Sequence, residues 1–388
     1  MGEIRIGIIT YPRIEDGEGR FLQAYALSSA ISGLGYDNEI LNYLPHEWVE
    51  RRTCLDKIKR FIKNPDICGY LLDIKRKLSG RMSKKSNNVS KEKYKQFIKE
   101  NLKYDLSKHP TKEELKNFKF DAWICGSDQI WNPHFAVGRD EVYYLQFAPK
   151  EKRISYAASM GTLDVDNSQL EMQKKWIQDI PYLAVRETGT CELINLRFNM
   201  QARHVCDPTF LMPIDWWDKL ANKRIIQERY LLLFLFDNNP LPRNVAQKIA
   251  NLYNLKIICI SNDVKDNRKY DIPYGVGPED FVSLFKYADF ICTQSFHGIV
   301  LSLLFNRQFY AFDRSERGEL SGLILRIKSL LSQMRLTSRI VDNSCKVEDC
   351  LEKEPIDFTY SNSVIANQRK QGLDFLKESI ERAVNHNV

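Results

Sequence analysis

His297 is the residue whose type and position in this sequence most suggest chemistry. It stands in "FICTQSFHGIVLSLLF", residues 290–305, where a strand-like apolar run passes through Ser295 into a helix-like run over 296–305. Because serine is a favoured N-cap, His297 is predicted to lie in the first turn of that helix, among backbone N–H groups that attract anions. A bound anion would favour the acid form of the imidazole, which would then serve as a general acid. The alternative is a histidine that caps a helix or bonds a carbonyl in a packed interface.

Further polar residues follow other strand-like runs. Gly126, Ser127, Asp128 and Asn132 come after "DAWIC", Arg186 and Glu187 after "LAV", and Asp207 after "RHVC". The carboxyl ends of parallel strands meet at one edge of a sheet, which predicts that these residues gather there. The guanidinium of Arg186 suits a carboxylate or a phosphate, unless it is a solvated arginine beside Glu187. The alternative for Asp128 is a residue that only shapes a turn, and for Asp207 one that only braces the turn before Pro208.

The elements that must position these residues alternate between strands and helices. Strand-like runs are predicted over residues 4–10, 38–44, 121–127, 153–159, 183–187 and 203–208, and then over 230–236, 256–261, 290–294 and 308–313. Helical patterns lie between them, over 21–36, 169–180, 243–253, 278–288, 296–305 and 322–334. Such alternation is typical of parallel sheets with helices on both faces.

The predicted fold is therefore α/β, with two doubly wound Rossmann-like domains that face one another across a cleft. The first domain is assigned to residues 1–210 and the second to 211–362, after a linker rich in proline, aspartate and tryptophan. A last helix, within 363–388, carries a stripe of leucine, isoleucine and valine and is predicted to pack back onto the first domain. Ligands of such folds bind at the carboxyl ends of the strands, so the cleft is the predicted site.

Composition excludes several classes of protein. The longest apolar run, residues 230–236, is far shorter than the roughly 20 residues of a membrane-spanning helix, and the first residues do not resemble a secretory signal, so we expect a cytoplasmic protein. The 9 cysteines are scattered without a C-x-x-C pair, which argues against a metal site or a disulfide framework. The sequence has no P-loop, no H-E-x-x-H motif and no nucleophile elbow, and Gly17 and Gly19 give only G-x-G.

The net charge of +7 is concentrated in one segment. Residues 51–100 hold 16 Lys and Arg against 5 Asp and Glu, a net of +11, which leaves 41 against 45, a net of −4, for the rest. Apolar residues recur there at helical spacing, which predicts a basic helical insertion in the first domain at about 46–115. One interpretation is a hairpin with a solvated basic face. The other is contact with the anionic inner leaflet of a membrane or with the diphosphate of a lipid-linked oligosaccharide. Nucleic acid is not expected as a partner.

Several pieces of the sequence resemble the polysaccharide pyruvyl transferase family, in order over roughly residues 4–335. The matching pieces include "DAWICGSDQIWNP", "AVRE", "CDPTFL", "ICTQSFHGIVLSLLFNRQFYAF" and "RIKSLL". The resemblance implies a fold like that of two-domain GT-B glycosyltransferases. It also implies transfer of pyruvate from phosphoenolpyruvate onto a sugar as a cyclic ketal, in capsule or exopolysaccharide assembly. By motif, His297 and Arg186 take the roles of the histidine and arginine around phosphoenolpyruvate.

This chemistry assigns tasks to the residues at the strand ends. His297 is predicted to donate the proton that the enol needs, and Arg186 to hold the carboxylate or phosphate of the donor. Asp128 is predicted as a third catalytic residue, which orients or deprotonates a hydroxyl of the acceptor. The predicted substrate-binding residues are Ser295, Phe296, Gly298, Gly126, Ser127, Asn132, Gly19 and Arg20. The scheme needs no metal and no cofactor besides phosphoenolpyruvate as donor substrate.

The loop after the first strand departs from the family pattern. Relatives usually carry an Asn-Tyr-Gly-like turn there, whereas this chain has "RIEDGEGRFLQAYAL" with Glu15, Asp16 and Glu18. This departure leaves two other hypotheses open. One is a GT-B glycosyltransferase that uses a nucleotide sugar, and the other is a non-catalytic scaffold in glycan assembly.

Overall fold

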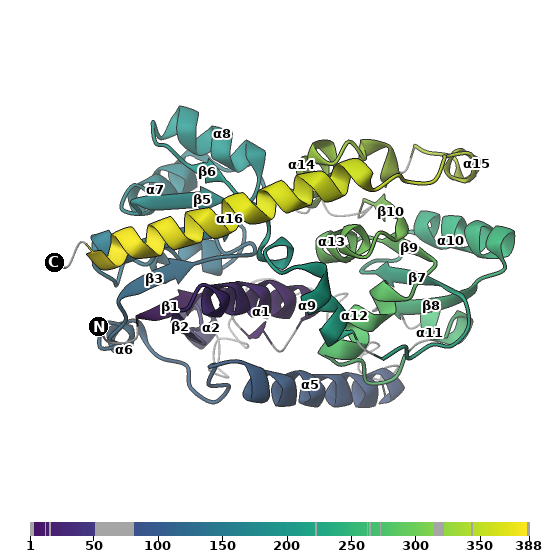
Figure 1. The fold of residues 1–388 in the computed structure, drawn as a ribbon, viewed down its shortest axis with the longest axis horizontal. Helices are drawn as coiled ribbons and strands as arrows, with labels where there is room; N and C mark the ends of the chain where they lie inside the picture. Colours follow the sequence, from purple (N-terminus) through teal and green to yellow (C-terminus); the bar gives the residue numbers. More distant parts are fainter. Residues whose placement is uncertain are drawn as a thin grey trace, which may run out of the picture.

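The chain folds into two α/β domains, each built around one parallel sheet (Figure 1). The computed structural model describes residues 4–385, apart from 12, 15–16, 51–80, 222, 262, 264, 272, 314–321 and 343. The predicted fold class is confirmed, because strands and helices alternate along both halves and every strand pair is parallel.

The first sheet has 6 strands in the order β2-β1-β3-β4-β5-β6. They are β1 (Arg5–Ile9), β2 (Asp37–Ile40), β3 (Ala122–Cys125), β4 (Arg153–Ala158), β5 (Tyr182–Val185) and β6 (Arg203–His204). The helices of this domain are α1 (Glu18–Gly33), α2 (His46–Glu50), α5 (Arg81–Asn101), α6 (Lys112–Leu115), α7 (Asn167–Ile177) and α8 (Thr188–Arg197). Strand β4 is buried along its whole length, as expected for a strand that helices cover on both faces.

The second sheet has 5 strands in the order β11-β10-β9-β7-β8. They are β7 (Tyr230–Leu235), β8 (Lys256–Ser261), β9 (Phe290–Thr293), β10 (Gln308–Phe312) and β11 (Ile340–Val341). The helices here are α9 (Ile214–Leu220), α10 (Pro240–Tyr253), α11 (Asp266–Lys269), α12 (Pro278–Lys286), α13 (Phe296–Leu304), α14 (Gly322–Gln333) and α15 (Val347–Leu351). In both sheets the second strand of the domain lies on one side of the first strand and the later strands lie on the other side. Ligands of doubly wound folds bind at the point where the strand order reverses in this way.

Several predicted strands, among them those over 38–44, 121–127 and 203–208, are shorter in the structure than their sequence patterns, and one strand was not predicted. The strand predicted over 38–44 ends at Ile40, and the one predicted over 203–208 is only Arg203–His204. These two strands lie at the edges of the first sheet, where only one neighbour supplies ladder hydrogen bonds. The unpredicted strand, β11, has 2 residues and is too short to produce a periodic pattern.

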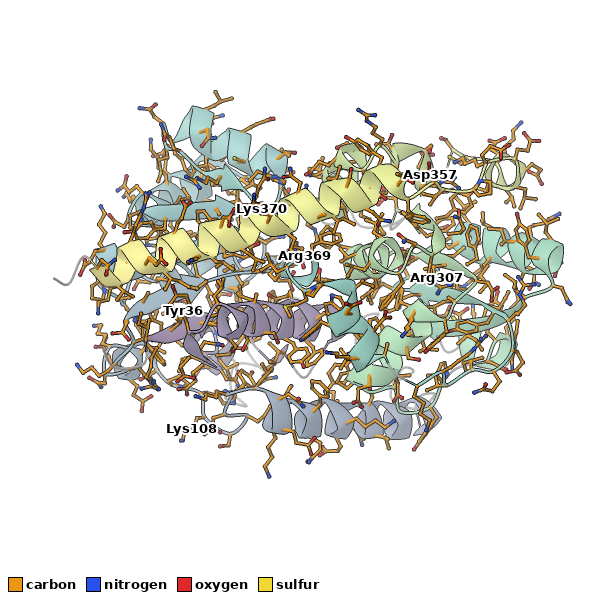
Figure 2. All side chains as sticks on the ribbon, in the orientation of Figure 1. Tyr36, Lys108, Arg307, Asp357, Arg369 and Lys370 are labelled. Carbon is orange, nitrogen blue, oxygen red and sulfur yellow. The ribbon has the colours of Figure 1, made fainter. Side chains whose placement is uncertain are left out.

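The last helix, α16 (Thr359–Asn385), runs from the second domain back across the first (Figure 1). It contacts β3 and β4 of the first sheet and α13 of the second domain. Arg369, near its middle, donates from Nε to the carbonyl oxygen of Phe210 at 2.9 Å and from Nη2 to that of Met212 at 3.2 Å (Figure 2). These carbonyls belong to the segment that joins the domains, so α16 fastens the connection between them.

The basic insertion contributes α5, which lies along both domains (Figure 1). Tyr94 packs edge-on against Phe21 of α1, with 5.2 Å between the ring centroids, and Lys93 pairs with Asp280 of α12 at 2.7 Å. This part of the insertion is therefore an interdomain brace. The apolar residues predicted for its first half, Leu55, Ile58, Phe61 and Ile62, lie outside the described residues.

Candidate functional site

His297 occupies the position predicted from the sequence. The hydroxyl of Ser295 accepts a hydrogen bond from the backbone N–H of Gly298 at 3.2 Å, so Ser295 is the N-cap of α13 and His297 lies in its first turn. The side chain is nevertheless buried, with 7% of the residue exposed. Gly298 also allows close packing, because a Cβ there would lie 2.6 Å from Oγ1 of Thr293.

Gly19 of the first domain lies directly against the imidazole of His297. A Cβ at Gly19 would be 2.6 Å from Nδ1 of His297, a distance at which one of the two groups has to move. Gly19 was predicted to bind substrate, and the structure shows it packing against the candidate catalytic side chain. The imidazole is thus held between α1 of one domain and α13 of the other.

Arg186, after β5, is part of a buried cluster of charges. Its Nη1 donates to Oδ2 of Asp207 at 2.7 Å and its Nε to Oε1 of Glu187 at 3.0 Å, while its guanidinium carbon lies 4.5 Å from the centre of the Phe296 ring. Burial opposes the charged form, but Glu187, Asp207 and Asp128 outweigh it and raise the pKa of Arg186 above its usual range. The interpretation of Arg186 as a solvated surface residue is therefore wrong, because only 3% of its side chain is exposed.

Asp207 connects Arg186 with His297. One carboxylate oxygen, Oδ2, accepts the bond from Arg186 and lies 3.6 Å from Nε2 of His297, which is ion-pair distance. The other, Oδ1, accepts bonds from the backbone N–H and the hydroxyl of Thr209 at 3.1 and 2.7 Å. Burial alone would raise the pKa of this carboxyl, but His297, Arg186 and Thr209 together lower it well below its usual value. Asp207 braces its turn, as the sequence allowed, and its Oδ2 also faces both Arg186 and His297.

Three buried polar atoms of this cluster are left over. Nε2 of His297, Nη2 of Arg186 and Oε2 of Glu187 have no hydrogen-bond partner within the described residues. An unpaired buried polar group costs roughly 1–3 kcal/mol, so native proteins keep few of them without a reason. Their convergence in one cluster points to a ligand with both acceptor and donor atoms.

A second buried arginine faces the same ring. Arg326 of α14 is 4% exposed, and its guanidinium carbon lies 5.7 Å from the centre of Phe296. No role was predicted for Arg326, although it begins the "RIKSLL" piece that carried part of the resemblance. Phe296 thus presents its ring to two cations, and the site is more cationic than the sequence indicated.

Arg20, predicted to bind substrate, and Asp128, predicted to be catalytic, both lie near Tyr11. The guanidinium carbon of Arg20 lies 4.4 Å from the centre of the Tyr11 ring. Burial is the main cause that raises the pKa of Tyr11, Asp128 adds to it and Arg20 opposes it, so both charges are close to this phenol. Asp128 also interacts electrostatically with Arg186, which ties this group to the buried cluster.

Three other predicted substrate-binding residues are held by the protein framework. A Cβ at Gly126 would lie 1.9 Å from the carbonyl oxygen of Tyr156, and the φ angle of Gly126 is 128°, so only glycine fits there. Ser127 is fully buried and donates through its hydroxyl to the carbonyl oxygen of Ala157 at 3.1 Å. The amide of Asn132 bonds its own turn, donating to Oε1 of Gln129 at 2.8 Å and accepting from the N–H of His134 at 3.0 Å.

The acidic residues of the loop before α1 are described only in part. Glu18 is the first residue of α1, and burial raises the pKa of its carboxyl, against the opposing effects of a backbone hydrogen bond and of Arg20. Its charge also helps to raise the pKa of Tyr94 on α5, after the larger effect of burial. Glu15 and Asp16 lie outside the described residues.

The described part of the chain contains neither a candidate metal site nor a candidate membrane-spanning helix. No group of three or more histidine, cysteine, aspartate or glutamate side chains among these residues is placed to hold a metal ion. None of the described helices combines the length and the apolar character that crossing a membrane requires.

Two parallel-sheet domains with cationic residues at facing strand ends define a two-domain α/β protein of the GT-B-like class. A family model described as "Polysaccharide pyruvyl transferase" matches residues 19–316, which is more than half of the chain. The chain therefore belongs to the polysaccharide pyruvyl transferase family and is a transferase of polysaccharide biosynthesis. A comparison with curated proteins gave no significant match.

Solved structures of other proteins share the fold. The UDP-GlcNAc 2-epimerase of Methanocaldococcus jannaschii, in complex with UDP-GlcNAc and UDP, has a TM-score of 0.52 and 14% identity, over 97% of this chain and 100% of that chain. The UDP-N-acetylglucosamine 2-epimerase from Rickettsia bellii has a TM-score of 0.52 and 11% identity, over 98% of each chain. At this identity the similarity concerns the fold alone.

Proposed function

We propose that this protein transfers pyruvate from phosphoenolpyruvate onto a sugar of a polysaccharide precursor, as a cyclic ketal. One observation carries the proposal: His297 and Arg186 flank the same oxygen of Asp207, and Nε2 of the first and Nη2 of the second are buried without a hydrogen-bond partner among the described residues. Family membership directs the choice of donor to phosphoenolpyruvate, which carries the carboxylate and phosphate oxygens that these two groups are suited to bind.

The donor side of the reaction uses the groups of the buried cluster. Arg186, already fixed by Asp207 and Glu187, offers a guanidinium that needs no reorientation to bind an anion. His297 supplies the proton to the methylene carbon of the enol, and Asp207 at 3.6 Å gives the protonated ring an anionic partner. Arg326 adds positive charge next to Phe296, where negative charge moves onto the departing phosphate.

Because the family acts on polysaccharides, we propose that the acceptor is a sugar or a lipid-linked oligosaccharide at the cytoplasmic face of the membrane. The basic residues of the insertion would attract the diphosphate of such a lipid or an anionic surface. Vesicle sedimentation with and without anionic lipid tests this part separately, and equal binding to neutral vesicles would contradict it.

Thermal unfolding with phosphoenolpyruvate, UDP and GDP, each added alone, tests the donor. A ligand that binds only the native state stabilises it by RT ln(1 + [L]/Kd), about 2.7 kcal/mol at 100 times Kd. We expect phosphoenolpyruvate to raise the unfolding temperature, and the Arg186→Ala variant to lose that rise. A rise with a nucleotide alone would instead indicate a glycosyltransferase. No rise with any of the three, together with no turnover, would favour the scaffold hypothesis.

A further inference from the structure

A groove with a volume of about 520 Å³ leads to the buried cluster from the side of α8 and α14. Figure 1 shows these two helices near one another at the top of the molecule, one from each domain. Both Glu187 and Arg326, members of the cluster, belong to the walls of the groove. The rest of the lining is rich in hydroxyl groups and glycine, with Thr162, Thr188, Gly189, Thr190, Ser329 and Ser332.

Glu187, one of the residues that line this groove, uses only one of its two carboxylate oxygens within the described chain. Its Oε1 accepts from Oγ of Ser159 at 2.7 Å and from Nε of Arg186 at 3.0 Å, which fixes the carboxylate in position. Its Oε2 is buried and has no hydrogen-bond partner among the residues that the structure describes. A carboxylate held by one oxygen, with acceptor capacity left on the other, is suited to a ligand that donates a hydroxyl.

We propose that the groove between α8 and α14 binds the acceptor sugar, and that Oε2 of Glu187 accepts the proton of its attacking hydroxyl. This inference rests on the proposed function. It gives Glu187 the task of deprotonating the acceptor hydroxyl, which the sequence had suggested for Asp128. Asn132, predicted to bind substrate, has its amide bonded within its own turn. The proposed role also gives a reason for the presence of Glu187 beside Arg186, whose charge the Asp207 carboxylate already neutralises.

The assignment balances the reaction. The protonated imidazole of His297 gives its proton to the methylene carbon of phosphoenolpyruvate, and the first hydroxyl oxygen bonds to the neighbouring carbon as its proton passes to Glu187. A second hydroxyl of the same sugar then forms the other carbon–oxygen bond while the bond to phosphate breaks. Its proton leaves with the phosphate, and the proton on Glu187 returns to His297 through solvent exchange.

The test uses a panel of p-nitrophenyl glycosides of galactose, glucose, mannose and N-acetylglucosamine with the intact protein and phosphoenolpyruvate. Binding is followed by saturation-transfer NMR and turnover by phosphate release. We expect at least one glycoside to bind the donor-loaded protein and to be turned over. Glu187→Gln is expected to lower kcat about 100-fold or more, with the thermal shift by phosphoenolpyruvate retained.

Two further variants distinguish a site from a structural role. Ser332→Tyr narrows the groove at an exposed position of α14, and is expected to raise KM for the glycoside at least tenfold with the phosphoenolpyruvate shift intact. Glu192→Gln, an exposed carboxylate on α8, is the matched control and is expected to change neither constant. If Glu187→Gln fails to fold, Ser332→Tyr carries the test.

Three results would overturn the inference. They are no binding of any glycoside to the donor-loaded protein, unchanged constants in Ser332→Tyr, and a folded Glu187→Gln protein with normal kcat. In each case, if phosphoenolpyruvate still raises the unfolding temperature, the proposed function remains supported. If phosphoenolpyruvate does not raise the unfolding temperature of the wild-type protein, the proposed function itself is refuted.

Discussion

Arg186 and Arg243 are two largely buried arginines that differ in how many of their guanidinium nitrogens have hydrogen-bond partners. Arg243 gives Nε and Nη2 to the two carboxylate oxygens of Asp266, and it also donates to the backbone carbonyls of Asn239 and Asp237. Arg186 has two carboxylate partners but keeps Nη2 unpaired within the described chain. Every nitrogen of the Arg243 guanidinium has a partner in its own domain, whereas one nitrogen of Arg186 has none within the described chain.

The location of the two side chains explains the difference. Arg243 lies on α10 and binds the first residue of α11 in the same domain, so nearby backbone carbonyls can accept its remaining hydrogen bonds. Arg186 lies where the domains meet, and its face packs on Phe296 of the other domain. Carboxylate partners alone thus do not distinguish the two arginines, whereas the unpaired Nη2 of Arg186 does.

The largest effect is expected from His297→Gln. If His297 is the proton donor, its removal should lower turnover about 10²- to 10⁴-fold, measured as phosphate release from phosphoenolpyruvate in the presence of acceptor. The control is His134→Gln, because His134 is exposed. A folded His297→Gln protein with wild-type kcat would remove His297 from the chemistry.

The paired substitutions Arg186→Lys and Arg243→Lys test the comparison directly. An ammonium cannot replace a guanidinium with several directed bonds, so Arg186→Lys should raise KM for phosphoenolpyruvate about 10- to 100-fold. Arg243→Lys should lower the free energy of unfolding by roughly 1–3 kcal/mol and leave KM unchanged. Steady-state kinetics and denaturant unfolding of both variants measure these two effects. An increase of KM of equal size in both variants would contradict the distinction between the two arginines.

Gly19→Ala should have an intermediate effect on turnover. The added methyl group would start 2.6 Å from Nδ1 of His297, so the imidazole or α1 must shift, and we expect kcat to fall about tenfold. In the matched variant Gly33→Ala, at the other end of α1, the new Cβ meets no described atom within 4 Å. That variant should keep full activity and gain up to about 1 kcal/mol of stability from helix propensity. Equal activities in the two would show that the contact does not position His297.

The smallest effect concerns the dependence of stability on pH. The pKa of Asp207 is lowered in the folded protein, so its contribution is fully present above the ordinary value of 3.8 and is lost as the pH falls towards the native pKa. Asp207→Asn should therefore flatten the fall of unfolding free energy below about pH 4, by at most about 1.4 kcal/mol per pH unit for one proton. Urea unfolding between pH 5 and pH 2.5 measures the slope. An unchanged slope would mean that Asp207 is not ionised with its cationic neighbours.

The sequence by itself determined the elements and the local placement of the principal residues. Apolar runs bounded by turn residues predicted most strands, and the serine before an apolar helical pattern placed His297 in a first turn, because N-caps and periodicity act within a few residues. Arg186 and Asp128 were found at strand ends for the same reason.

Only the tertiary structure decided what these residues touch. The close approach of Gly19 to His297, the stacking of Arg186 and Arg326 on Phe296, and the bracing of both domains by α5 join residues distant in sequence. Glu187 shows most clearly what a local sequence pattern cannot predict. The sequence showed a carboxylate beside an arginine, but which of its oxygens the protein uses depends on packing between strands and domains, and no local pattern encodes that.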